Sequence, residues 1–154
     1  MKSLDSYVRE LHETFDETSR LLTDDLHTLS QFNLTPQQES YLMFCVKFAP
    51  LTATDLVKEF QVSKSAISQV ISRLEKERFI EREQNPENKR ETLIYLGPKG
   101  RMFARRIKDF NEKVREEYYT HLSIQEIESV ISSLKKLNTV ILDKQAKSQK
   151  QQQL

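Results

Sequence analysis

Residues that break helices and form tight turns are scarce in this chain, which has only two glycines and four prolines among 154 residues. A fold of many short strands needs such residues at each turn, and collagen-like or linker-like chains are enriched in them. With 37% hydrophobic and 31% charged residues, the chain is polar but able to bury a core. The sequence therefore predicts a mostly helical fold, in one domain or in one domain with a small extension.

The cysteine content and the apolar runs indicate the cellular compartment of the protein. A single cysteine, Cys45, excludes a disulfide framework within one chain and is typical of a reducing compartment. The longest apolar run, residues 41–46, is six residues long, whereas a membrane-spanning helix needs about 18. The first residues mix charged and apolar side chains, unlike a signal peptide. We expect a soluble, cytoplasmic protein without a membrane partner.

The N-terminal segment carries an apolar residue every three or four positions, which predicts a helix over residues 5–30, roughly 25 residues and about 38 Å long. Such a helix is long for a lone chain of this size. Its apolar stripe needs a partner, either the C-terminal helices or a second subunit. The stripe consists of Leu4, Val8, Leu11, Phe15, Leu22, Leu26 and Leu29.

Three helix starts follow from capping chemistry. Thr35 can cap a helix with Gln38 completing a capping box, and Thr52 can do the same with Asp55. Ser63 can cap a third helix after a very short break. The predicted helices are 35–48, 52–60 and 63–78.

After residue 79 the pattern changes from a helical to an alternating one. Residues 80–84 and 92–96 are expected to be two strands of a hairpin, joined by a turn that begins with Asn85 and Pro86. A helix that starts with Pro98 at its first position and includes residues 101–120 follows. A capped helix over 124–142 comes after it. These elements divide the chain into the segments 1–33, 34–100, 101–143 and 144–154.

Two short helices followed by a hairpin predict a winged helix-turn-helix. The second helix has one apolar face, and its other face carries hydroxyls, an amide and two cations, with no carboxylate before Glu75. Small polar side chains let a helix approach base edges in the major groove, and Gln69 and Arg73 have the reach for base contacts. The alternative is an ordinary exposed face, but such faces usually mix both charge signs. The candidate DNA-binding residues of this helix are Ser63, Lys64, Ser65, Ser68, Gln69, Ser72 and Arg73.

The hairpin tip and the distribution of charge support the same hypothesis. Asn88, Lys89 and Arg90 lie at the tip, and a cation on a thin hairpin can enter the minor groove. The formal net charge of the chain is only +1, but residues 1–34 carry −4 and residues 58–113 carry +5. A basic middle segment indicates a polyanionic partner, and the low total predicts weak non-specific binding.

Two motifs resemble those of the MarR family of dimeric winged-helix regulators (multiple-antibiotic-resistance regulators). Residues 85–90, Asn-Pro-Glu-Asn-Lys-Arg, are similar to the family pattern Asp-Pro-x-Asp-x-Arg, which places Arg90 on the wing arginine. Residues 96–100 match the pattern Leu-Thr-x-x-Gly at Leu96 and Gly100. The order of predicted elements agrees with the family over essentially the whole chain.

The sequence departs from the family pattern at a few positions. Asn85 and Asn88 replace aspartates, so a carboxylate that would brace the wing arginine is missing. Gly97 replaces a capping threonine, at a cost of a few tenths of a kcal/mol. Gln61 stands where many helix-turn-helix turns have glycine, which predicts a slightly strained turn.

The resemblance implies a homodimer that binds double-stranded DNA at a pseudo-palindromic operator, usually as a repressor, and releases it on binding a small effector or on oxidation. It implies an N-terminal dimerisation helix (1–33), a DNA-binding domain (34–100) and C-terminal dimerisation helices (101–143), followed by a flexible tail (144–154). A rival hypothesis is a dimeric helical adaptor whose winged helix binds protein. An enzyme is not expected, because nucleophile motifs, phosphate loops and glycine-rich turns are missing, and no cofactor is implied. His12, His27 and His121 lack the spacing of a metal site. Cys45 is a candidate redox sensor, but its apolar neighbours favour a packing role.

Overall fold

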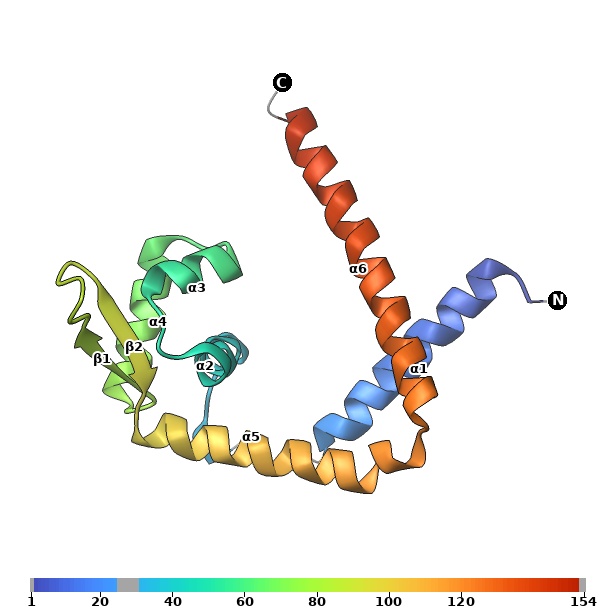
Figure 1. Cartoon of the computed structure of the whole chain (residues 1–154), viewed down its shortest axis with the longest axis horizontal. Coiled ribbons are helices and arrows are strands. Elements are labelled where there is room, and N and C mark those ends of the chain that lie inside the picture. The colour runs from blue at the N-terminus through green and yellow to red at the C-terminus, as the bar shows by residue number, and fades with distance from the viewer. Residues whose placement is uncertain (1, 25–30, 153–154) are drawn as a thin grey trace. The chain divides into compact units, whose positions relative to one another are not determined.

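The computed structural model describes residues 2–24 and 31–152. It confirms a mostly helical fold with a two-stranded antiparallel wing (Figure 1). The chain divides into two compact units, residues 1–111 and 112–154; the finer division into four segments stays a prediction. In chain order the elements are α1 (Leu4–Asp24), α2 (Pro36–Phe48), α3 (Ala53–Phe60), α4 (Lys64–Lys76), β1 (Ile80–Gln84), β2 (Thr92–Leu96), α5 (Pro98–Glu117), the 3-10 helix η2 (Tyr119–His121) and α6 (Ile124–Gln152).

The predicted helix starts at residues 35, 52 and 63 are confirmed. The Thr35 hydroxyl accepts the Gln38 N–H at 3.2 Å, and the Gln38 side chain accepts the Thr35 N–H at 2.9 Å. Thr52 and Asp55 form the same reciprocal pair at the start of α3, and these hydrogen bonds hold the pKa of the Asp55 carboxyl below its usual range. At α4, Ser63 Oγ accepts the Ala66 N–H at 3.1 Å.

The break between α3 and α4 contains the backbone conformation that the sequence pattern indicates. Gln61 adopts φ 50° and ψ 41°, the left-handed region, where a Cβ atom is crowded by the following carbonyl. Its N–H donates to the carbonyl of Val57 at 3.0 Å and closes the last turn of α3. The turn is therefore made at a conformational cost that glycine would not incur.

Gln61→Gly is expected to raise the free energy of unfolding by roughly 0.5–1 kcal/mol, because it removes the left-handed strain and leaves the hydrogen bond in place. Urea unfolding measures the change as a higher midpoint at unchanged slope. Gln61→Ala is the matched control, since it keeps the Cβ and should leave the midpoint near that of the wild type. A lower urea midpoint for Gln61→Gly than for Gln61→Ala would contradict the presence of backbone strain at residue 61.

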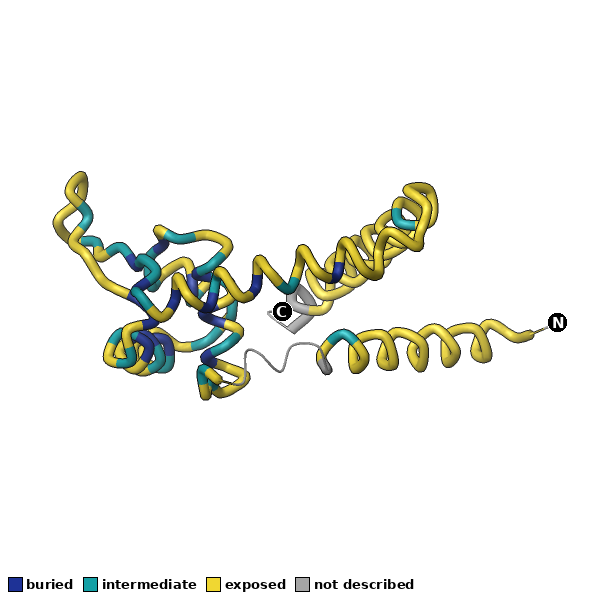
Figure 2. The backbone as a smooth tube through the Cα atoms, turned by 90° about the horizontal axis from the view of Figure 1, so that it is seen from below, coloured by how far each residue is buried: buried dark blue, intermediate teal, exposed yellow. Residues whose placement is uncertain are grey.

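The core of the first unit holds the wing against the helices. β1 and β2 pair from Ile80 opposite Leu96 to Gln84 opposite Thr92. Leu51, between α2 and α3, extends the sheet by exchanging two backbone hydrogen bonds with Ile94. Buried residues gather in this part of the chain (Figure 2). They are Tyr41, Leu42, Cys45, Leu51, Leu56, Ile67, Ile71, Leu74, Phe79, Ile80, Ile94, Phe103 and Ile107.

The end of α4 differs from its prediction. The sequence predicts a helix to residue 78, but α4 ends at Lys76, and Arg78 is left-handed at φ 64°. The Phe79 N–H donates to the carbonyl of Leu74 (2.8 Å), and the Arg78 N–H donates to that of Glu75 (2.9 Å). This is the Schellman arrangement, which usually has glycine at the left-handed position. Arginine stands there instead, so the sequence carries no stop signal.

Both glycines of the chain lie against this turn. The Gly97 N–H donates to the Phe79 carbonyl at 2.9 Å, and the Lys99 N–H donates to the Arg78 carbonyl at 3.0 Å. A Cβ atom would lie 2.6 Å from the Arg78 oxygen if added at Gly97, and 2.0 Å from the Phe79 oxygen if added at Gly100. Close backbone approach therefore explains a glycine at residue 97 in place of a capping threonine.

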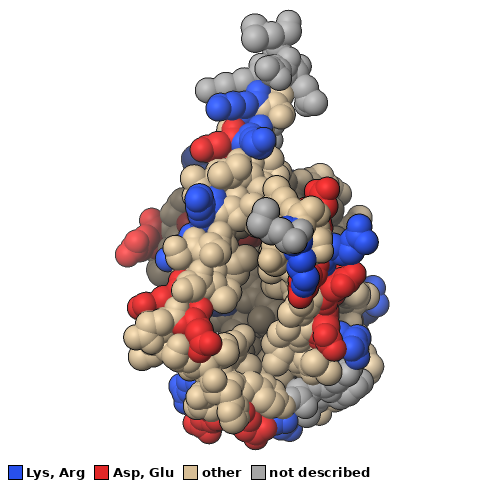
Figure 3. All heavy atoms as spheres, turned by 90° about the vertical axis from the view of Figure 1, so that its right-hand side faces the viewer, with Lys and Arg blue, Asp and Glu red and all other residues tan. Residues whose placement is uncertain are grey.

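The long helices α1 and α6 carry apolar stripes that stay exposed (Figure 2). In α1, Leu4 is 77% and Phe15 61% exposed; Leu26 and Leu29 of the predicted stripe lie outside the described residues. In α6, Ile131, Leu134 and Leu137 are about half exposed. On the face in Figure 3, acidic and basic side chains are interspersed among uncharged ones.

The ends of the C-terminal helices also differ from prediction. α5 ends at Glu117, and residues 119–121 form a separate 3-10 turn instead of continuing the helix to 120. Ser123 and Glu126 form the predicted capping box at the start of α6. The predicted end of α6 at residue 142 is wrong, since the helix continues to Gln152. Lysine, glutamine and alanine are good helix formers, and no glycine or proline interrupts them.

Candidate nucleic-acid interface

The polar face of α4 lies open to solvent. The seven residues predicted to contact DNA from the recognition helix, Ser63 to Arg73, are all exposed. On the opposite face, Ile67, Ile71 and Leu74 are at most 3% exposed. The buried face fixes the rotation of the helix, and its position between α3 and β1 leaves the polar face as the outer surface. Ser63 caps the helix, so its hydroxyl oxygen already accepts one hydrogen bond, from the Ala66 N–H.

Arg73 extends from this face with weak restraint. Its Nε lies 3.4 Å from a Glu77 carboxylate oxygen one turn later, and its side chain is 67% exposed. Exposed pairs of this kind contribute little free energy. The guanidinium can therefore exchange this partner for a base edge or a phosphate at small cost.

The wing tip is braced by its asparagines. Asn85 Oδ1 accepts the Glu87 N–H at 3.0 Å, and Asn88 Oδ1 accepts the Arg90 N–H at 3.2 Å. Asn85 Nδ2 donates to the Glu91 carboxylate at 2.7 Å, a bond that an aspartate could not make. The asparagines thus order the turn in place of the missing carboxylates, and the side chains of Arg90 and its neighbour Lys89 extend into solvent.

One ion pair joins the recognition helix to the wing, and the sequence did not reveal it. Arg82 on β1 donates from Nε, at 2.9 Å, and from Nη2 to the same oxygen of Glu75 on α4. The hydrogen bonds raise the pKa of the Arg82 guanidinium above its usual value. The two residues are seven apart across the left-handed turn at residue 78, and no helical or strand spacing predicts that contact.

The structure places Cys45 in the core, at 1% exposure. Burial raises the pKa of its thiol to about 11, so the reactive thiolate is scarce at neutral pH. Both observations favour a packing role over redox sensing. Among the described residues, no three His, Cys, Asp or Glu side chains form a cluster able to hold a metal ion, and no helix is long and apolar enough to cross a membrane.

Comparison with known proteins finds a family model that matches the middle of the chain. The model of the MarR family matches residues 32–91, the segment that forms α2, the helix-turn-helix and most of the wing. The fold of this segment is that of a MarR-like winged helix-turn-helix. Both motifs that suggested this family lie at defined places in the fold, one at the wing tip and the other at the start of α5.

Individual relatives extend the likeness to most of the chain. The HTH-type transcriptional regulator BilQ of Clostridioides difficile is 28% identical over 106 residues, which cover 69% of this chain and 72% of BilQ. The fold is similar to Streptococcus pneumoniae FabT in complex with DNA (TM-score 0.63, 19% identity, 86% and 98% of the two chains). It is also similar to S. aureus MepR bound to ethidium bromide (TM-score 0.65, 21% identity, 84% and 95%).

The MarR family model and the relative BilQ both indicate a DNA-binding transcriptional regulator, a class of protein that is not enzymatic. The family favours the DNA hypothesis over the adaptor alternative. The comparisons do not test the individual contact residues on α4 and the wing, which stay predictions supported by their exposure.

Proposed function

We propose that this regulator is a homodimeric repressor that occupies a pseudo-palindromic operator. The observation that carries the proposal is the exposed, acid-free face of α4 beside a wing whose tip presents Lys89 and Arg90. Two such helices, related by a twofold axis, enter successive major grooves about 34 Å apart, while each wing tip reaches the neighbouring minor groove. Bound there, the dimer blocks access to a promoter.

Selection from a library of random-sequence duplexes by the wild-type protein tests the operator. The enriched sequence, called the selected duplex below, should contain two inverted half-sites whose centres are about 10 base pairs apart. It should bind two chains per duplex. Enrichment of a single asymmetric site bound by one chain would contradict the proposal, as would a duplex that leaves transcription from an overlapping promoter unchanged.

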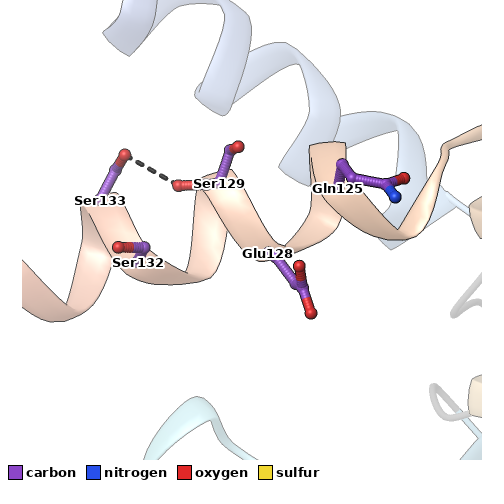
Figure 4. Close-up of a pocket in the computed structure, with 5 residues that line it drawn as sticks. All are labelled: Gln125, Glu128, Ser129, Ser132 and Ser133. Atoms are coloured by element: carbon purple, nitrogen blue, oxygen red, sulfur yellow. Dashed lines mark hydrogen bonds between the residues drawn. The ribbon is translucent and has the colours of Figure 1, made fainter.

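The exposed stripes of α1 and α6 support the homodimer. A stripe of large apolar side chains along a helix needs a cover, and a second copy supplies the same stripes. The opposite face of α6 is polar, with Gln125, Glu128, Ser129, Ser132 and Ser133 (Figure 4). Each α6 therefore has a single apolar face to bury.

Leu134→Glu is expected to dissociate the dimer, because it places a charge in the apolar stripe of α6, where the leucine is 46% exposed in a single chain. Sedimentation at micromolar concentration should give about twice the 18.2 kDa chain mass for the wild type and the single mass for the variant. Ser132→Glu introduces the same charge on the polar face and should leave the dimer intact. A wild-type monomer, or equal dissociation of both variants, would contradict this interface.

A small effector is the proposed means of release, and it acts by binding the DNA-incompetent state more tightly. MepR is seen with ethidium bromide. In this chain, a hollow of about 400 Å³ is lined by aromatic and charged side chains, including Phe79, Lys99 and Glu77. Because Glu77 also pairs with Arg73, a ligand there would act next to a predicted base contact. The buried thiol of Cys45 favours a ligand over oxidation as the signal.

A further inference from the structure

The junction between α4 and the wing lies where DNA geometry demands a phosphate contact. The major and minor grooves of a duplex are separated by one sugar-phosphate backbone. If α4 occupies a major groove and the wing tip the adjacent minor groove, as in the proposed function on which this inference rests, that backbone must cross the surface between them. The groups at this surface then face a chain of negative charges.

A hollow of about 180 Å³ lies at this junction. Its sides are supplied by the polar face of α4 and by both wing strands, and its apolar part consists of residues that belong to the core or pack beside it. The lining residues are Ala53, Ser68, Ile71, Arg82, Thr92 and Ile94. Ser68 and Thr92 are exposed and offer hydroxyl groups that can donate to an oxyanion.

The two faces of the wing differ in charge. Residues that pair directly across the two strands point to the same face of the hairpin, so Arg82 shares a face with its buried partner Ile94. Thr92 lies two residues before Ile94 on the same strand and therefore points to that face as well. Glu81 and Glu83 alternate with Arg82 and lie on the other face. The side of the wing that carries Arg82 is therefore turned toward α4, and the carboxylates of Glu81 and Glu83 lie on the other side.

Arg82 retains donors for a second partner. A guanidinium has five N–H groups, and two of them bond to Glu75. Three remain, and the side chain is 40% exposed. Since Glu75 holds one edge of the guanidinium, the other donors are presented without further loss of side-chain freedom.

We propose that Arg82, with the hydroxyls of Ser68 and Thr92, binds one phosphodiester group of the DNA backbone that runs between the recognition helix and the wing. Each subunit of the dimer holds one such phosphate. Glu75 orients the arginine and does not contact the DNA.

Salt-dependent binding of the selected duplex tests this contact. Each phosphate that the protein neutralises adds about 0.9 to the magnitude of the slope of log K against log salt, so Arg82→Gln should lower that magnitude by about 1.8 for a dimer with two sites. Binding should weaken on the order of ten-fold or more. Arg82→Lys should keep the wild-type slope because it keeps the charge. Arg115→Gln, which removes an exposed arginine also paired with a glutamate, should change neither quantity.

A duplex in which one phosphate of the DNA backbone is replaced by an uncharged group identifies the contacted phosphate directly. Methylphosphonate placed at the backbone position between the two grooves should weaken wild-type binding but add little to the loss in Arg82→Gln. Thr92→Val should weaken binding several-fold at unchanged slope, because it removes a neutral donor. Thermal unfolding should show Arg82→Gln folded at the assay temperature.

The outcomes separate this inference from the proposed function. If Arg82→Gln keeps the wild-type slope, or if the methylphosphonate and Arg82→Gln losses are additive, the arginine only braces the wing and the inference fails. If the wild type shows no salt-dependent binding at all, the proposed function itself fails.

Discussion

Arg73→Ala should weaken binding of the selected duplex by about 1–3 kcal/mol per half-site, which is roughly five-fold to 150-fold. Arg73 is exposed at the C-terminal end of the predicted reading face and is held by a 3.4 Å pair with Glu77. The pair of parallel hydrogen bonds from arginine to guanine is the commonest specific contact between a side chain and a base. The expected effect therefore has two parts, a lower affinity and a weaker discrimination at one base pair of each half-site.

Fluorescence anisotropy with the selected duplex and with single-base variants of it measures both parts. Arg115→Ala is the matched control, since Arg115 is also 67% exposed and also pairs with a glutamate. It should keep the wild-type affinity and base preference. A uniform loss over all base variants would assign Arg73 to a phosphate, and an unchanged affinity would remove it from the interface.

Gly100→Ala should destabilise the fold by about 3 kcal/mol or more. The added Cβ would lie 2.0 Å from the Phe79 carbonyl oxygen, a backbone atom that cannot rotate away. Relief requires α5 to move from the turn that joins α4 to β1. Since this turn sets the position of the wing relative to α4, we expect DNA binding to decline together with stability.

Urea unfolding of Gly100→Ala measures the loss of folding free energy. If the variant does not fold, circular dichroism shows the loss of helix. Asp109→Ala is the control on the same helix, at an exposed position where alanine meets no neighbouring backbone. Its free energy of unfolding should be within about 0.5 kcal/mol of the wild type. Wild-type stability of Gly100→Ala would mean that α5 does not approach the turn closely enough to exclude a Cβ atom.

The predictions that held depend on local chemistry. Thr35, Thr52 and Ser63 were identified as caps because each bonds to a backbone N–H within its own first turn. The hairpin was predicted from alternation and turn residues that lie within one segment, and the apolar face of α4 from helical spacing. Together these placed the polar face of α4 and the wing tip, which are the larger part of the candidate site.

The features that were missed depend on tertiary contact. The left-handed turn at Arg78 contains no glycine that would predict it from the sequence. This turn places Arg82 within hydrogen-bond distance of Glu75. The reason for Gly97 appears only once α5 packs on that turn. The helical end of α6 was missed for a different reason, because a polar composition was read as fraying where helix propensity is high.

The central claim is that the exposed face of α4 reads DNA sequence. The most direct measurement is the ratio of dissociation constants for a scrambled and the selected duplex at about 0.15 M salt, for the wild type and for the double variant Gln69→Ala, Arg73→Ala. We predict a wild-type ratio of about 10³ or more, reduced at least ten-fold in the double variant while its binding to scrambled DNA falls far less. A wild-type ratio near one, or a ratio unchanged in the double variant, would contradict the claim.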